Sequence, residues 1–199
     1  MLIDDKATRS QALKAFKLWL PKIAGDGGKD IHLFFAGHGL ASDDGEDMYL
    51  LPYDGSPELL DRTAILRKEL YEDIALTKPR SVIVFLDTCY SGTTRGTDML
   101  IASRPIAIVA REQAIPENFT VFTAAAGDQT AKPLEEAKHG LFSYFLMKGM
   151  EGVADSNQDN KITALELHEY VKENVWQQSS NKQLPELQGD AERVLVRFK

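Results

Sequence analysis

The sequence predicts one α/β domain with a mostly parallel sheet, and two observations support this prediction. Segments 31–36 and 81–85 are short apolar runs rich in β-branched and aromatic residues, which is typical of strands buried on both faces. The stretches before these runs have apolar residues at three- and four-residue steps, as amphipathic helices do: Leu13, Phe16, Leu20 and Ile23, then Leu66, Leu70 and Ile74. Strands that alternate with helices form parallel sheets covered by helices.

The other elements are expected in chain order. The first helix begins at Thr8 or Ser10 and ends at the glycine-rich segment 25–28, because glycine favours helix ends. The remaining predictions are a stub of strand at 2–3, a strand at 48–51, a helix over 63–76, a strand or helix start at 106–110, a buried strand at 119–126, a helix over 141–150, a polar loop at 155–166, a helix up to about Trp176 and an edge strand at 195–198.

Length and composition fit a single domain over residues 1–199. Of 199 residues, 43% are hydrophobic and 27% are charged, which is ordinary for a globular protein. The net charge of −7 argues against nucleic acid as a partner and suits basic substrates. No apolar run is long enough to cross a bilayer and no signal peptide begins the sequence, so no membrane partner is expected. The single cysteine allows no intramolecular disulfide, and the expected location is the reducing cytoplasm.

Two side chains with catalytic potential follow the two buried runs. Cys89 comes after the run 81–85, and His38, between two glycines, comes after the run 31–36. If the runs are parallel neighbours, both side chains leave the same edge of the sheet, where α/β folds bind ligands. A thiol beside an imidazole is the minimum equipment for nucleophilic acyl transfer. The competing interpretation of Cys89 is a small buried apolar residue.

The other histidines are assigned no catalytic role. His32 lies within the first run and is expected to pack in the core. His139 and His168 have no nucleophile near them in the sequence, and structural or surface roles are expected for both.

The segment Phe35-Ala36-Gly37-His38-Gly39, followed by Asp87-Thr88-Cys89-Tyr90-Ser91-Gly92, resembles the caspase-fold cysteine peptidases. Cys89 lies 51 residues after His38, and about 50 residues separate this pair in caspases. True caspases have Gln-Ala-Cys at the nucleophile, so the local motif is more similar to metacaspases and to bacterial caspase-like peptidases of the orthocaspase type. Further matches are Asp54 after Leu51-Pro52, segment 127–129 and segment 139–142.

The resemblance covers nearly the whole chain and implies a caspase-like α/β/α sandwich. It divides the chain into a large-subunit-like part at 1–92, a linker-like segment at 93–118 and a small-subunit-like part at 119–199. The family's first strand and helix are not recognised in the sequence. Three explanations are open: the sequence is a fragment, a partner chain or self-association completes the sheet, or the sheet is shorter than in the family. Many relatives cleave themselves in the linker, where Arg95, Arg104 and Arg111 are either cleavage sites or plain surface charges.

The same resemblance implies a mechanism that needs no cofactor. Cys89 attacks the scissile carbonyl, His38 acts as general acid and base, and the backbone N–H groups of Gly39 and Cys89 form the oxyanion hole. Asp87 pairs with a basic P1 side chain, Arg or Lys, of a peptide or protein substrate, and Asp128 is a second candidate acid of this pocket. The competing interpretation of Asp87 is that it caps nearby backbone amides.

Segment 155–166 has the spacing of a calcium-binding EF-hand loop. The candidate ligands lie at loop positions 1, 3, 5, 7 and 12 and are Asp155, Asn157, Asp159, Lys161 and Glu166. Asn160 takes the place of the usual glycine, and asparagine tolerates the left-handed conformation needed there. A helix capping box formed by Thr163 and Glu166 explains the glutamate equally well without a metal.

The sequence thus favours a cysteine endopeptidase that cleaves after Arg or Lys. The alternative is a catalytically silent caspase-like domain that acts as a protein-interaction or calcium-responsive module. A third hypothesis, another thiol acyl-transfer enzyme on a related sheet, predicts turnover of non-peptide amides only.

Overall fold

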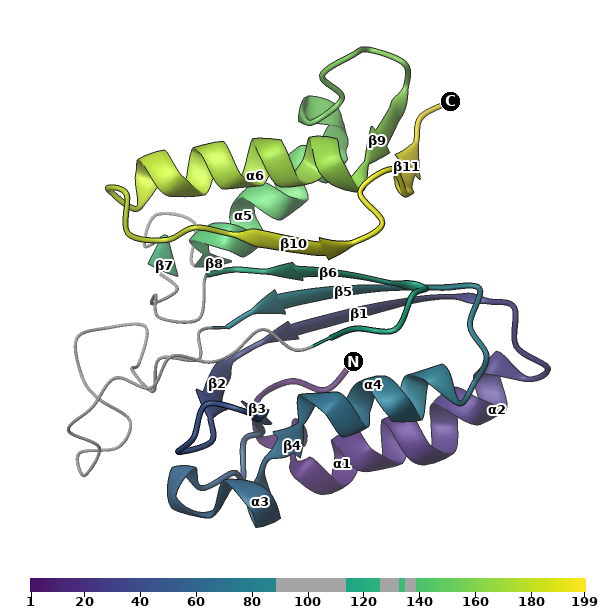
Figure 1. The fold of residues 1–199 in the computed structure, drawn as a ribbon, viewed down its shortest axis with the longest axis vertical. Coiled ribbons are helices and arrows are strands. Elements are labelled where there is room, and N and C mark those ends of the chain that lie inside the picture. The colour runs from purple at the N-terminus through teal and green to yellow at the C-terminus, as the bar shows by residue number, and fades with distance from the viewer. Residues whose placement is uncertain (89–113, 126–132, 135–138) are drawn as a thin grey trace.

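The computed structural model describes residues 1–88, 114–125, 133–134 and 139–199. Its central sheet has four strands in the order β1-β5-β6-β10, which are Asp30–Ala36, Ser81–Asp87, Phe119–Thr123 and Glu186–Gly189. β5 pairs in parallel with β1 and β6, and only β10 is antiparallel, on β6. The predicted fold class, α/β with a mostly parallel sheet between layers of helices, is therefore confirmed (Figure 1).

One face of the sheet is covered by helices from the first part of the chain: α1 (Arg9–Lys14) and α2 (Leu20–Ala24), which a π-helical turn joins, and α4 (Arg67–Ala75) (Figure 1). The Thr8 hydroxyl begins α1 by accepting a hydrogen bond from Gln11 N at 3.3 Å, as expected for an N-cap. Leu70 and Ile74 of α4 pack on Val82 and Val84 of β5.

The opposite face is covered by α5 (Leu141–Lys148) and α6 (Ala164–Gln178) (Figure 1). Phe142 and Leu146 of α5 share one core cluster with Leu167 of α6 and with Ile83 and Phe85 of β5. α5 and α6 are thus fixed to the sheet by apolar packing, which orients the amino-terminal turn of α5.

Small sheets surround this framework. β2 (His38–Ala41), β3 (Met48–Leu51) and β4 (Ile65–Leu66) form one antiparallel sheet, and α3 (Leu60–Thr63) lies between β3 and β4 in the chain. β7 (Pro133–Leu134) pairs with β8 (His139–Gly140), and β9 (Lys161–Thr163) pairs with β11 (Val194–Arg197).

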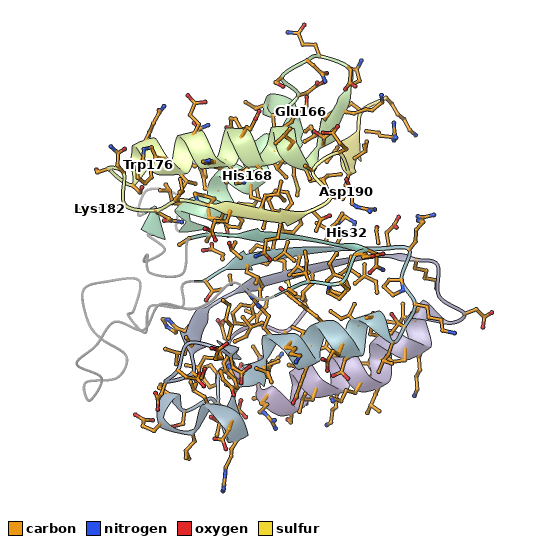
Figure 2. The ribbon with its side chains drawn as sticks, viewed as in Figure 1. His32, Glu166, His168, Trp176, Lys182 and Asp190 are labelled. Carbon is orange, nitrogen blue, oxygen red and sulfur yellow. The ribbon has the colours of Figure 1, made fainter. Side chains whose placement is uncertain are left out.

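Both strands were predicted to be buried on both faces, and the structure confirms this for β5 but not for β1. All seven residues of β5 are buried, but exposed and half-buried residues alternate along β1. Leu33 and its neighbours at two-residue steps face the α4 side, while His32 lies exposed on the other face (Figure 2). Phe34, two residues further along the strand, is exposed as well. The reason is the sheet order, because β1 lies at the edge of the sheet formed by the described strands, and α5 and α6 cover only the strands farther in. The expectation that His32 packs in the core is therefore wrong.

Several element boundaries also differ. The stub of strand expected at 2–3 is absent and a 3-10 turn follows at Asp4–Lys6, and the second helix begins at Arg67 because the preceding residues form β4. The tail strand β11 pairs with β9 rather than with the central sheet, whose edge is instead β10. Residues 106–110 and most of the linker-like segment lie outside the described residues, so the predicted division of the chain stays a prediction. In the described part of the chain, no helix combines the length and apolar character needed to cross a bilayer.

Candidate active site

The candidate site lies where β1 and β5 end, at Ala36 and Asp87, which we call the carboxyl edge. These two residues are register partners in the parallel pair, and Gly37 N donates a hydrogen bond to Asp87 O at 3.2 Å. The segment that leads from β1 to His38 and the segment that leads from β5 to Thr88 therefore leave the sheet at neighbouring points. Cys89 and Asp128 lie outside the described residues.

His38, which lies between two glycines, belongs to a strand. It begins β2 and is paired with Leu51 of β3, and Gly39 is paired with Leu50. His38 is half-buried and Gly39 is buried. The next residue, Leu40, is fully buried in a small cluster that also contains Leu60. The ladder and this cluster fix the backbone that carries the imidazole.

Asp87 is a buried carboxylate held against the first turn of α5. Only 1% of the residue is exposed, and Oδ2 accepts a hydrogen bond from the hydroxyl of Ser143. Gly140, the N-cap residue of α5, lies so close that a Cβ there would overlap the carboxylate. A negative charge is favoured at a helix amino terminus by the helix dipole. The contact with α5 thus adds a structural function to the residue expected to select the P1 side chain.

Asp54, another residue of the family resemblance, connects two parts of the fold. Its Oδ1 accepts a hydrogen bond from Arg9 N at 2.7 Å at the start of α1, and Arg9 Nε donates to Ala64 O at 2.9 Å. Both bonds tie the first helix to the segments on either side of α3. This observation assigns Asp54 to the support of the fold.

A cavity of about 180 Å³ lies between α1, β4 and α4, away from the carboxyl edge. Its lining combines apolar residues such as Phe16 and Leu70 with the carboxylates of Glu69 and Asp73. None of His38, Gly39 and Asp87 contributes to it, so it is distinct from the candidate active site.

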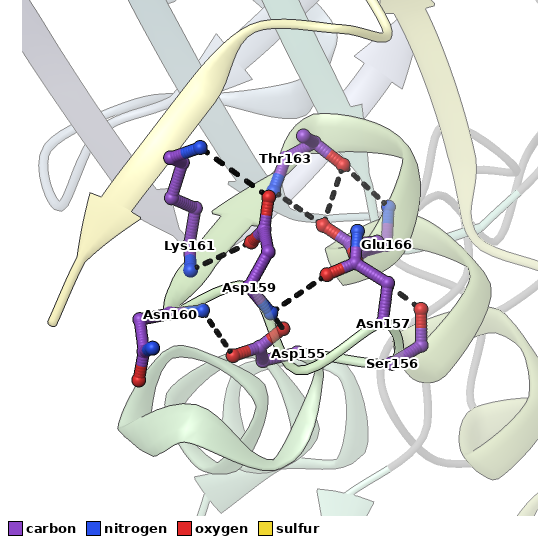
Figure 3. Close-up of polar contacts among 8 residues, drawn as sticks. All are labelled: Asp155, Ser156, Asn157, Asp159, Asn160, Lys161, Thr163 and Glu166. Carbon is purple, nitrogen blue, oxygen red and sulfur yellow. Dashed lines mark hydrogen bonds and ion pairs between the residues drawn. The ribbon is translucent and has the colours of Figure 1, made fainter.

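The loop expected to resemble an EF-hand is closed by hydrogen bonds from its own backbone (Figure 3). Asp155 accepts from Asp159 N at 3.1 Å and from Asn160 N at 3.0 Å, and Asn157 Oδ1 accepts from Asp159 N at 2.9 Å. Asp159 Oδ1 accepts from Lys161 N at 3.0 Å. Asn160 has φ 64°, the left-handed conformation expected at that position.

Glu166 takes part in the predicted capping box of α6. Its Oε2 accepts from Thr163 N at 2.9 Å, and Glu166 N donates to Thr163 Oγ1 at 3.2 Å (Figure 3). The backbone N–H of Thr163 lowers the pKa of Glu166, because this hydrogen bond favours the ionised form. Among the described residues, no group of three or more His, Cys, Asp or Glu side chains is arranged to hold a metal. The capping-box interpretation is confirmed, and calcium binding stays a prediction.

Sequence reasoning missed Ser143. Gly140 lies within segment 139–142, which supported the family resemblance, but Ser143 follows that segment and belongs to no motif. It is 56 residues from Asp87 along the chain, so only the packing of α5 on β5 brings the two side chains together. The side chain of His139 lies outside the described residues, and His168 is half-buried with a pKa lowered by that burial.

Comparison with known proteins agrees with this architecture. Residues 3–196 match the family model described as caspase domain. Among solved structures, the fold is similar to that of caspase-1 from Spodoptera frugiperda, with a TM-score of 0.59 and 13% sequence identity, over 96% of this chain and 71% of that chain. A search of the curated proteins gave no match. Because the family model spans almost the entire sequence, we conclude that the chain belongs to the caspase-domain family.

Proposed function

We propose that this protein is a cysteine endopeptidase of the metacaspase type, with Cys89 and His38 as its catalytic dyad. The observation that supports the proposal is the parallel pairing of Ala36 with Asp87, because each catalytic residue lies two positions beyond one of these partners. Segments that leave the same edge of a parallel sheet are where α/β folds assemble their active sites.

The proposed reaction has two steps. The Cys89 thiolate bonds to the scissile carbonyl carbon, the C–N bond breaks, and His38 donates the proton that the leaving amine takes up. Water, deprotonated by His38, then hydrolyses the thioester and restores the thiol. Backbone N–H groups of Gly39 and Cys89 stabilise the oxyanion in both steps, and one such donor typically supplies about 2.7–4 kcal/mol.

The proposed specificity is for Arg or Lys at P1. A buried carboxylate at the carboxyl edge supports this choice, since a basic side chain can enter an apolar-walled pocket only with an acidic partner. Asp87 supplies that carboxylate, and Asp128 is proposed as the second acid. The net charge of −7 further favours the approach of basic peptides.

Fluorogenic peptides that differ only at P1 test this proposal. The expected result is cleavage of the Arg and Lys peptides by the wild-type protein, complete loss in Cys89→Ala and a loss of about 10²–10⁴-fold in His38→Ala. An arginyl active-site-directed electrophile should label Cys89 in the same preparation. Cleavage of P1 Asp peptides alone, or activity that survives Cys89→Ala, would contradict the proposal.

The edge of β1 supports a second proposal, that another strand completes the sheet. Lys29 O accepts from Arg80 N, and Gly37 N donates to Asp87 O, so the odd-numbered residues of β1 turn their peptide groups toward β5. The peptide groups of the even-numbered residues, such as His32 and Phe34, point the opposite way, where no described strand pairs with β1. We expect a partner chain or a second copy to bind there.

The alternative function, a silent calcium-responsive or protein-interaction module, is favoured only by the loop at 155–166. The turns at Asp155, Asn157 and Asp159 arrange its carboxylate and amide oxygens along one short segment. Calorimetric binding of calcium to a protein that cleaves no peptide would support this alternative. Peptide cleavage that is independent of calcium would contradict it.

A further inference from the structure

We propose that Ser143 is a positioning residue, which orients the Asp87 carboxylate so that the P1 pocket prefers Arg to Lys. This inference rests on the proposed function. Asp87 is 1% exposed and Ser143 is 7% exposed, so their hydrogen bond is shielded from water. Buried carboxylates need such partners, because leaving a buried polar group without one costs free energy.

Gly140 and Ser143 both lie against the Oδ2 oxygen of the carboxylate. A Cβ at Gly140 would lie 2.9 Å from Asp87 Cγ, so glycine permits the carboxylate to lie directly against the helix start. Ser143 lies three residues later on the same helix, and its hydroxyl binds Oδ2. The Gly140 backbone leaves little room beside Oδ2, and the directional hydrogen bond from Ser143 sets the rotation of the carboxylate.

The framework around these contacts is rigid. β5, which carries Asp87, is buried along its whole length, and α5 is fixed by Phe142 and Leu146 in the core shared with β5. Neither element can shift without disrupting that core, because protein interiors are densely packed. The orientation set by Ser143 is therefore preserved when a substrate binds.

Fixed orientation matters more for Arg than for Lys. A guanidinium forms two parallel hydrogen bonds with a carboxylate, so the plane of the carboxylate must match it. An ammonium group is a compact charge with rotatable donors and tolerates a rotated partner. The Ser143 hydroxyl is consequently expected to increase the preference for Arg.

The test compares Ser143→Thr with Ser143→Val, which have nearly the same shape and differ by a hydroxyl, alongside Ser143→Ala. Two peptides that differ only as Arg or Lys at P1 are assayed for kcat and KM. We expect Ser143→Val and Ser143→Ala to raise KM for the Arg peptide about tenfold and for the Lys peptide less than about threefold. Ser143→Thr should retain the wild-type ratio. The rate of Cys89 alkylation by iodoacetamide, which does not use the P1 pocket, should be unchanged in all three.

Thr120→Val is the matched control, because it removes another buried hydroxyl, one in β6 that is remote from Asp87, and it should change neither KM. Equal loss on both peptides, or slower alkylation in the Val variant, would show a general structural function and overturn the inference. If the wild-type protein cleaves the peptides, and Ser143→Val and Ser143→Ala keep its ratio of KM values for the Arg and Lys peptides, this inference is wrong and the proposed function stands. A wild-type protein that cuts neither peptide would overturn the proposed function, and this inference with it.

Discussion

At the scale of single residues, buried polar groups determine both the candidate site and the stability of the sheet. Asp87 Oδ2 accepts a hydrogen bond from a side chain of α5, whereas the hydroxyl of Thr120 is fully buried and has no hydrogen-bond partner among the described residues. The two cases differ in cost, because an unpartnered buried group loses its hydration without compensation. The direction in which a substitution changes the free energy of unfolding can therefore be stated for each position.

Gly140→Ala is expected to destabilise the protein by about 1–3 kcal/mol, the usual cost of inserting a methyl group into a packed site. The steric conflict is with the Asp87 carboxylate specifically, so the same substitution should cost at least about 1 kcal/mol less in an Asp87→Ala background. Urea denaturation of the two single variants and the double variant measures this coupling. Additive effects would show that Gly140 does not contact Asp87.

Thr120→Val is expected to stabilise the protein by about 1 kcal/mol. Valine keeps the shape of threonine, removes the buried hydroxyl and is favoured in strands. Urea denaturation should show a higher midpoint with an unchanged slope. Ser81→Ala is the contrasting variant and should destabilise, because the Ser81 hydroxyl donates to Asp30 Oδ1 at 2.7 Å. Destabilisation by Thr120→Val would mean that this hydroxyl does have a partner in solution.

At the scale of elements, the sequence predicted what depends on local patterns. β5, β3 and the helix that ends at Gln178 follow from apolar runs and capping residues, and each is present. The burial of β1 could not be predicted, since the apolar run 31–36 does not reveal that its strand lies at an edge of the sheet. β10 was missed because a four-residue strand that contains Glu, Gln and Gly has no clear strand pattern.

The residues of the candidate site likewise fall into those that a local sequence motif indicated and those that it did not. The motifs that carry the family resemblance made His38, Gly39 and Asp87 candidates, and the structure brings their segments to one edge of the sheet. Ser143 was missed, because a hydrogen bond between residues 56 positions apart depends on how α5 packs on β5. Long-range contacts of this kind leave no local pattern in a single sequence.

The capping box of α6 predicts a pH dependence of stability. The folded state lowers the pKa of Glu166, so its stabilising effect is complete above the unfolded-state pKa of about 4.3 and is lost as pH falls through the folded value. We expect the wild type to exceed Glu166→Gln in free energy of unfolding by about 1 kcal/mol at pH 7 and by progressively less below pH 4. Chemical denaturation with chelator present measures this difference. A difference that does not change between pH 7 and pH 3 would show that the carboxylate is not needed.

At the scale of the whole molecule, the two edges of the central sheet differ. β10 closes one edge as an antiparallel strand, and α6 lies against it. The loop after α6 is tied to the end of β6, because Gln183 Nε2 donates to Ala124 O at 2.8 Å. In the described part of the sheet β1 forms the other edge, with Phe34 53% exposed on the face away from α4. Edge strands with exposed apolar residues tend to pair with another chain. The asymmetry therefore locates the expected partner at β1.

We expect the wild-type protein to self-associate with rising concentration when no other partner is present, and Phe34→Lys to shift this equilibrium toward monomer by at least about tenfold. A lysine on an edge strand carries a charge that an added neighbour would have to bury, which opposes pairing. Light scattering coupled to size exclusion measures the shift. Leu76→Lys is the matched control, because Leu76 is 78% exposed but lies after α4 rather than on the edge strand.

Self-association is also expected to affect activity. Phe34 is register partner to Phe85, whose strand leads to the carboxyl edge, so an added strand would extend the sheet beside His38. Association should accordingly raise kcat/KM in the wild type and not in Phe34→Lys. A wild type that stays monomeric at every concentration would argue against self-pairing, and equal responses of the Phe34 and Leu76 variants would locate the contact elsewhere.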